Sequence, residues 1–246
     1  MKHATLLTVI TVLSIILIFV VGEFVYIMKN GKNVPAPDIP RQTQVLGTKG
    51  PVLKYVVMGD STTIGQGADY TKSYAYASAQ HLATKYQVHL LNVGISGAVA
   101  TGVVKEQLAK AVTARPDVVL LGVGANDATH FTGNSTFEMS VQAIIDGLHA
   151  ANPNVKIIVT GCPAMGSVAR FPPGARQLAG YRERQINSAY RRLVTKNKLT
   201  FAPVARETGQ AFAADPTLFA QDNFHPNARG YALWIPVVNR ALDTVL

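Results

Sequence analysis

Apolar residues along the 246-residue chain fall into one long run and five short ones. The long run covers residues 6–28 and contains a single charged residue, Glu23. A run of 18 or more apolar residues can cross the hydrocarbon core of a bilayer, which is roughly 30 Å thick. No polar face interrupts the first 17 residues of the run, which disfavours a helix buried in a soluble core. We therefore expect residues 1–28 to be an N-terminal transmembrane anchor.

A cleaved signal peptide is the alternative for the same residues, with Lys2 as its basic start. The apolar run is long for such a peptide, and no Ala-x-Ala site follows it, although residues 20–22 offer a poor cleavage site. The nearby lysines and arginines lie mostly after the run, which by the positive-inside rule favours a cytoplasmic domain. Because long domains translocate largely regardless of charge, we still expect an extracytoplasmic domain, anchored in the cell membrane or else secreted.

Residues 29–50 are polar and contain three prolines, without apolar periodicity. This composition is typical of an extended linker that gives a domain reach from a bilayer surface. We expect the folded domain to cover residues 51–246.

The five short apolar runs are rich in β-branched residues and predict strands at residues 53–58, 88–93, 118–123, 155–160 and 199–204. Their nearly continuous apolar character indicates strands buried on both faces. Helical segments are expected between and after them, at residues 73–86, 102–114, 136–151, 178–198 and from about 227, where Pro236 should kink or shorten the last helix. Alternating strands and helices predict an α/β domain with a parallel, doubly wound sheet.

The chain carries a net charge of +9, and eight of its lysines and arginines lie between residues 170 and 198. That stretch is either a solvated helix face or a surface for anionic lipid or an acidic wall polymer. No aromatic interleaving accompanies it, so nucleic acid is not an expected partner. Cys162 is the single cysteine, which excludes an intrachain disulfide, and it is expected to pack as a small hydrophobic residue.

Four short motifs lie at the places where such sheets bind ligands, beyond the carboxyl ends of the strands. They read Gly-Asp-Ser at 59–61, Gly-Ile-Ser-Gly at 94–97, Gly-Ala-Asn-Asp at 124–127 and Asp-Asn-Phe-His-Pro at 222–226. Each motif alone is common, and glycine or asparagine at such positions often only shapes a turn. Three of them nevertheless close consecutive strands, and the fourth directly precedes the last helix. This order predicts one site built from all four.

Serine is a poor nucleophile at neutral pH without an adjacent base, and a histidine can accept and return its proton. Ser61 and His225 are the candidates for these two roles, and Asp222 lies three residues before His225, where it can orient the imidazole. An oxyanion needs fixed donors, which Gly97 can supply from its backbone and Asn126 from its side chain. This chemistry requires no metal or cofactor, and the sequence holds no cluster of metal-ligating residues.

The motifs GDSTTIGQG, NVGISGA, VGANDAT and DNFHPNARGYALW resemble blocks I, II, III and V of the SGNH (GDSL-type) hydrolases, a family of serine esterases and lipases. The resemblance covers residues 53–242 and implies a flavodoxin-like, three-layer α/β/α sandwich around a five-stranded parallel sheet. It implies that Ser61 is the nucleophile, His225 the base and Asp222 its partner. The oxyanion donors would be Ser61, Gly97 and Asn126. The implied function is hydrolysis of carboxylic esters of lipids, thioesters or O-acetylated glycans through an acyl-enzyme.

Three other functions stay open. An acyltransferase would use the same Ser–His chemistry, and a catalytically inactive glycan- or lipid-binding module would keep the fold alone. A flavin- or nucleotide-binding protein is disfavoured because residues 122–127 lack the third glycine of a dinucleotide fingerprint. The partners we expect are an ester substrate and, through residues 6–28, a membrane. The proline-containing connection at 162–178 is expected to shape the pocket, and Tyr231 and Trp234 to pack the last helix.

Overall fold

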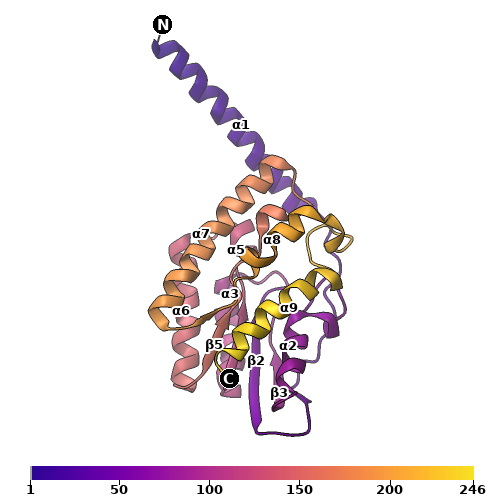
Figure 1. Ribbon diagram of the computed structural model, residues 1–246. Helices are drawn as coiled ribbons and strands as arrows, with labels where there is room; N and C mark the ends of the chain where they lie inside the picture. Colours follow the sequence, from indigo (N-terminus) through magenta and orange to yellow (C-terminus); the bar gives the residue numbers. More distant parts are fainter. Residues whose placement is uncertain (1) are drawn as a thin grey trace.

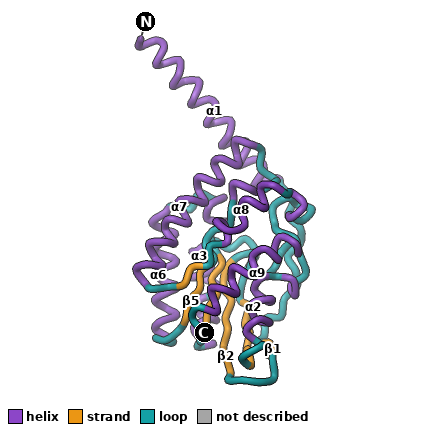
Figure 2. Tube along the Cα trace, viewed as in Figure 1, coloured by secondary structure: helices purple, strands orange, loops and turns teal. Residues whose placement is uncertain are grey.

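A six-stranded mixed sheet lies at the centre of the computed structural model, which describes residues 2–246 (Figures 1 and 2). The strands are β1 (Gln44–Leu46), β2 (Val52–Gly59), β3 (Gln87–Asn92), β4 (Val118–Gly122), β5 (Lys156–Val159) and β6 (Thr200–Phe201). Their order is β1-β3-β2-β4-β5-β6, and all neighbours are parallel except β1 and β3. Every residue of β4 is buried, as expected for a strand covered on both faces.

The five predicted strands are all present, but the expectation of a purely parallel, five-stranded sheet is wrong. The sixth strand, β1, pairs antiparallel with β3 and aligns Gln44 with Leu90. It has three residues and lies on the sheet edge, with Val45 exposed. Because β1 is this short and partly exposed to solvent, it contains no apolar run from which the sequence could predict a strand.

Two layers of helices cover the sheet and confirm the three-layer α/β/α arrangement (Figure 1). One layer contains α2 (Tyr74–Leu82), α8 (Val204–Ala214) and α9 (Ala228–Asp243). The other contains α3 (Ala100–Glu106), α4 (Leu108–Ala114), α6 (Asn134–Ala151) and α7 (Pro173–Asn197). Ser73 caps α2 by accepting from the Tyr76 N–H, and α9 continues past Pro236 to Asp243, so that proline does not shorten it.

The helix predicted over residues 102–114 is divided at Gln107 into α3 and α4. The fully buried Gln107 side chain accepts a hydrogen bond from the Gly59 N–H at 2.8 Å and donates one to the Gly59 carbonyl at 2.8 Å. A buried backbone pair needs such partners, because unpaired polar groups are costly in the interior. At the break between the two helices, Gln107 therefore binds the last residue of β2.

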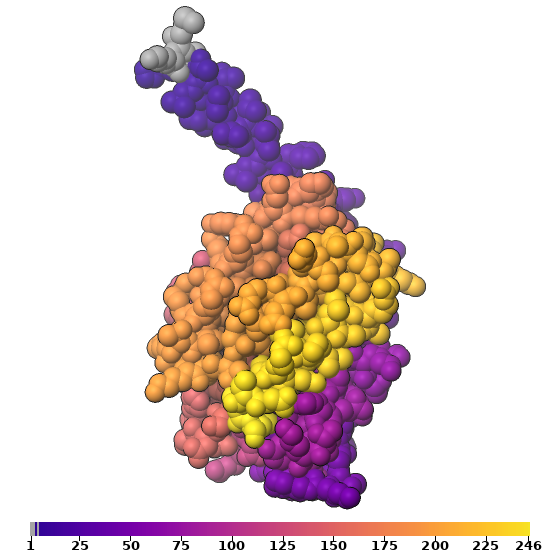
Figure 3. Space-filling view, viewed as in Figure 1, coloured from indigo at the N-terminus to yellow at the C-terminus, as the bar shows by residue number. Residues whose placement is uncertain are grey.

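The first helix, α1 (Lys2–Asn30), projects from the body of the molecule, and Figure 3 shows most of its length without contact to the domain. Its segment Thr5–Asn30 is long and apolar enough to cross a membrane, by length and composition. Its last turns pack on the domain, where the buried ring of Phe24 lies 5.1 Å from Phe171 and 5.4 Å from Phe131.

The chain that follows α1 does not form the free linker expected over residues 29–50. Ile39 is buried with Ile64 and Tyr70, and Arg41 donates a hydrogen bond to the Gly94 carbonyl at 2.9 Å. After these contacts the chain enters the sheet as β1. The prolines of this segment therefore shape an extended chain that lies on the surface of the domain.

Candidate active site

Ser61 follows β2 in a tight turn at the carboxyl edge of the sheet. Gly59 begins this turn with φ +143°, and a Cβ there would lie 2.0 Å from the Gly122 carbonyl oxygen. The Asp60 N–H donates to that same oxygen at 3.0 Å, which joins the ends of β2 and β4. Only glycine permits this approach. The side chain of Ser61 is 5 % exposed and faces the site.

The three predicted catalytic side chains form one hydrogen-bonded series. His225 Nε2 lies 3.0 Å from Ser61 Oγ, and His225 Nδ1 lies 2.6 Å from Asp222 Oδ2. Ser61 and His225 are 164 positions apart in the sequence, so the fold alone brings them together. The loop that carries His225 is closed by a bridge between Phe219 and Pro226, just before α9.

Asp222 is the most heavily bonded group of the site. Its Oδ1 accepts from the N–H groups of Phe224 at 2.9 Å and His225 at 3.0 Å, and its Oδ2 accepts from the Val34 N–H at 3.1 Å. Burial raises the pKa of Asp222, but the hydrogen bonds from His225, Phe224 and Val34 outweigh it and hold that pKa well below its usual range. The carboxylate is therefore ionised and can stabilise a protonated His225.

The two predicted oxyanion residues lie on adjoining loops. Gly97 has φ +78°, a backbone conformation that favours glycine, and a Cβ there would meet no protein atom within 4 Å. Asn126 is the second residue of the short helix α5 (Ala125–Thr129), and its Nδ2 donates to the Ala98 carbonyl at 3.1 Å. The N–H groups of Ser61 and Gly97 meet no acceptor within residues 2–246. Both N–H groups are therefore free to donate a hydrogen bond to an oxygen of a substrate.

Two further carboxyl groups are buried beneath the site. Both oxygens of Asp127 accept from the Ala100 N–H, at 3.0 and 3.2 Å, and Asp60 accepts from the backbone and hydroxyl of Thr62 at 2.9 and 2.8 Å. Burial raises the pKa of Asp60 to about 6 and that of Asp127 to about 6, because the charged form loses its water. These groups fix the loops that carry Ser61 and Gly97, and neither contacts the ring of His225.

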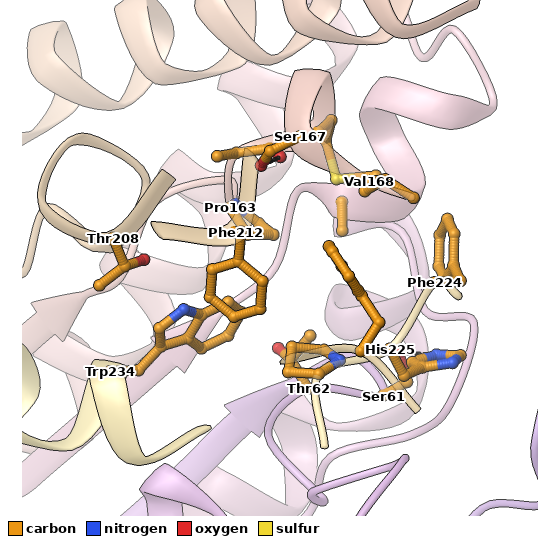
Figure 4. A pocket seen from close by; sticks show the side chains of 15 residues that line it. Ser61, Thr62, Pro163, Ser167, Val168, Thr208, Phe212, Phe224, His225 and Trp234 are labelled. Carbon is orange, nitrogen blue, oxygen red and sulfur yellow. Dashed lines mark hydrogen bonds between the residues drawn. The ribbon is translucent and has the colours of Figure 1, made fainter. Parts of the chain in front are cut away.

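A largely apolar pocket opens beside Ser61 and His225 (Figure 4). Its cavity holds about 30 Å³ of space for the centre of a water-sized molecule. The larger apolar side chains that line it are Met165, Val168, Phe212, Phe219, Phe224 and Trp234. The connection at 162–178 contributes two of them, as predicted, and Trp234 lines the pocket in addition to packing α9.

Four residues that support the site escaped the sequence analysis. Gln66 lies within GDSTTIGQG, and Gln107 gives no signal apart from a polar residue in an apolar helix pattern. Val34 contributes only its backbone, which a side-chain pattern cannot show. Arg170 belongs to the basic stretch whose other members lie mostly on the exposed face of α7, yet its own side chain is only 9 % exposed. Arg170 is therefore an exception to the solvated face.

A serine bonded to a histidine, which is bonded in turn to an aspartate, is typical of serine hydrolases. The model of the GDSL-like lipase/acylhydrolase family matches residues 57–233, so the chain belongs to that family, as its motifs indicate. It is 28 % identical over 197 residues to the GDSL-like esterase Rv1075c of Mycobacterium tuberculosis, covering 78 % of this chain and 62 % of that protein. The chain thus spans less than two thirds of that relative.

Solved structures share the fold at low sequence identity. The structure of TesA gives a TM-score of 0.66 at 18 % identity and covers 78 % of this chain and 99 % of that one. An extracellular lipase from Streptomyces rimosus gives 0.62 at 22 % identity, covering 77 % and 99 %. At these identities the likeness establishes the α/β/α fold alone.

Proposed function

We propose that this protein is a serine ester hydrolase that forms an acyl-enzyme on Ser61. The observation that carries the proposal is the series Ser61 Oγ, His225 Nε2, His225 Nδ1 and Asp222 Oδ2, joined at 3.0 and 2.6 Å. Ser61 Oγ attacks the carbonyl carbon of the ester while His225 Nε2 takes its proton. The same proton then passes to the departing alkoxide, and the C–O bond of the ester breaks. Water, activated by His225, finally releases the acid from Ser61.

The negative charge that develops on the carbonyl oxygen needs donors that are in place beforehand. The free N–H groups of Ser61 and Gly97 and the amide of Asn126 are proposed to supply them. One N–H of Asn126 is already committed to the Ala98 carbonyl, which leaves the second for the oxyanion. The ionised Asp222 stabilises the imidazolium of His225 while both charges exist.

The pocket supports a short acyl group as the part of the substrate that it holds. A space of 10–15 Å³ suffices for one water, so a cavity of about 30 Å³ has room for an alkyl chain of roughly two to three carbon atoms beyond the ester carbonyl. Its lining is mainly aromatic and aliphatic, which suits an alkyl chain better than a sugar. Acetyl to butanoyl esters are thus the proposed substrates, and the alcohol part lies outside this cavity.

The experiment that tests the function compares Ser61→Ala with Ser167→Ala. Ser167 lines the same pocket, but its hydroxyl donates to the Ala164 carbonyl and has no histidine partner. We expect wild type and Ser167→Ala to hydrolyse 4-nitrophenyl acetate and to be labelled by a fluorophosphonate. Ser61→Ala should do neither, apart from weak residual catalysis. Comparable turnover by Ser61→Ala and wild type would refute the proposal.

We also propose that α1 is a membrane anchor and that the domain lies outside the cytoplasmic membrane. The support is the spanning length of Thr5–Asn30 and the exposed apolar side chains from Leu6 to Phe19. Protease added to intact spheroplasts should digest the domain. Protection until lysis would place the domain in the cytoplasm instead, and release of a soluble protein that lacks residues 1–22 would indicate a cleaved signal peptide.

A further inference from the structure

The carboxylate of Asp222 contacts more than the histidine that it orients. We propose that Arg170 is a positioning residue that holds Asp222 toward His225, and that it does so together with residues 32–34, the segment directly after α1. The inference rests on the proposed Ser–His–Asp mechanism. If so, residues 32–34, directly after the proposed anchor, help to set the geometry of the active site.

Arg170 contacts both the main chain and the carboxylate of Asp222. Its Nε donates to the Asp222 carbonyl at 2.9 Å, and its Nη2 lies 3.7 Å from Asp222 Oδ2. The guanidinium carbon lies 4.8 Å from the centre of the Phe224 ring, one residue before His225. The side chains of Arg170 and Asp222 are 9 % and 1 % exposed, so water screens this pair little. A planar guanidinium fixed at this many points restricts the carboxylate in both position and angle.

The other edge of the guanidinium binds the segment after α1. Nη1 donates to Asn33 Oδ1 at 2.8 Å, and Nη2 donates to the Lys32 carbonyl at 3.1 Å. These two bonds bring the next residue, Val34, to the place where its N–H reaches Asp222 Oδ2 at 3.1 Å. Arg170 therefore supplies its own contacts to Asp222 and also sets the position of a second donor.

The carbonyl of Val34 leads to the oxyanion loop. It accepts from Gln66 Nε2 at 2.6 Å, and Gln66 Oε1 accepts in turn from Ser96 Oγ at 2.6 Å. Ser96 directly precedes Gly97, the proposed oxyanion donor. One residue of the segment after α1 thus connects the catalytic acid with the loop that is to stabilise the transition state.

Removal of Arg170 should affect the chemical step in a recognisable way. Without Arg170, Asp222 is held less firmly and therefore orients and stabilises the imidazolium less well. This lowers kcat without weakening substrate binding. The loss of activity should therefore appear in kcat and leave KM nearly unchanged.

The test compares Arg170→Gln and Arg170→Lys with Arg176→Gln in the full-length protein. Arg176 is an exposed arginine near the start of α7 that donates only to the Ala169 carbonyl, so its variant is the control. We expect Arg170→Gln to lower kcat by about ten- to a hundred-fold, the effect of losing a charge-assisted hydrogen bond, with KM within about two-fold. Arg170→Lys keeps the charge but not the planar, forked guanidinium, so it should lose less activity than Arg170→Gln.

A double-mutant cycle with Asp222→Ala decides whether Arg170 acts through the carboxylate. If it does, adding Arg170→Gln to Asp222→Ala lowers kcat no further, and thermal unfolding of each variant verifies that it is folded. An equal loss in both backgrounds, or full activity in folded Arg170→Gln, would overturn the inference. Failure of the Ser–His–Asp mechanism itself would appear separately, as an active Ser61→Ala protein.

Discussion

The side-chain amide of Asn126 donates a hydrogen bond to the carbonyl oxygen of Ala98 at 3.1 Å. This bond joins the start of α5 to the loop that contains Gly97. The neighbouring residue Asp127 adds its bonds to the Ala100 N–H, so two consecutive side chains hold the same loop. The proposed oxyanion donors are thereby fixed relative to one another before any substrate binds, which is the condition for effective charge stabilisation.

Replacement of Asn126 by alanine should lower kcat by roughly 10²–10³, about 2.7–4 kcal/mol, with little change in KM. The reason is that the donor matters mainly once charge has developed on the substrate oxygen. Steady-state kinetics on 4-nitrophenyl acetate measure both constants, with exposed Asn154→Ala as the control. A raised KM with unchanged kcat would mean that Asn126 binds the ground state instead.

Gly97→Ala should destabilise the protein by roughly 1–2 kcal/mol, because its φ of +78° is unfavourable for any residue with a Cβ. The added methyl group meets no atom within 4 Å, so the cost is one of backbone conformation alone. Gly102→Ala is the matched control inside α3, and it should stabilise the protein by roughly 0.5–1 kcal/mol. Urea unfolding of both variants measures these changes. Equal stability of the two variants would exclude strain at Gly97.

Met165→Ala should shift the preferred substrate from acetyl and butanoyl esters toward longer chains. Met165 lines the acyl cavity, and one additional methylene in a hydrophobic pocket is worth about 1–3 kcal/mol. The measurement is kcat/KM over a series of 4-nitrophenyl esters, at a temperature where the variant remains folded. Met139→Ala, on the exposed face of α6, should leave the profile unchanged. An unaltered profile in Met165→Ala would show that this cavity does not hold the acyl chain.

The buried Asp127 should make the protein less stable as the pH rises from 4 to 7. Its pKa is about 6 in the folded protein and about 3.9 in the unfolded chain, so the folded state binds the extra proton between these values. Its contribution to the free energy of unfolding is fully present below pH 4 and lost as the pH passes 6, by roughly 3 kcal/mol. Asp127→Asn should remove this loss, measured as unfolding in urea at pH 5 and pH 7.5.

The pKa of Asp222 is lowered on folding, whereas that of Asp127 is raised, so Asp222 does not obscure the measurement of stability between pH 5 and 7.5. Its pKa is lowered in the folded protein, so its stabilisation is present above pH 4 and disappears only as the pH falls further. Burial also raises the pKa of Asp60 to about 6, but Asp60 is present in both wild type and variant, so the difference between their pH profiles reports on Asp127. If Asp127→Asn and wild type changed in parallel between pH 5 and 7.5, the buried carboxyl would not be the source of the slope.

The sequence predicts the parts of the fold that depend on long apolar runs and on side-chain chemistry. The presence of the five parallel strands and the grouping of Ser61 with Asp222 and His225 follow from such patterns, although β3 and β6 are only partly buried. It does not predict β1, which is too short to show a period, or the division of the helix at Gln107, which depends on a backbone pair in a distant strand.

The sequence does not predict the contacts of Val34 either, for a related reason. Its two hydrogen bonds are made by the peptide backbone, which is the same in every residue except proline. The role of Arg170 cannot be read from the sequence for another reason. Arg170 belongs to a basic stretch whose other arginines are mostly exposed on α7, and it differs from them only by its contact with Asp222, 52 positions away. Contacts between distant segments of this kind become visible only when the tertiary structure is known.

The chain between Val34 and Gln44 is attached at both ends, at Asp222 and at β3. Insertions and deletions in ordinary spacers are tolerated, because a flexible loop gains or loses little free energy with length. Here a change of even one residue would move one attachment out of register, so this stretch should resist length variation as a strand pair does. Freedom to vary length then belongs to α1 before Phe24, where added turns would lengthen the proposed anchor without moving the contacts to Asp222.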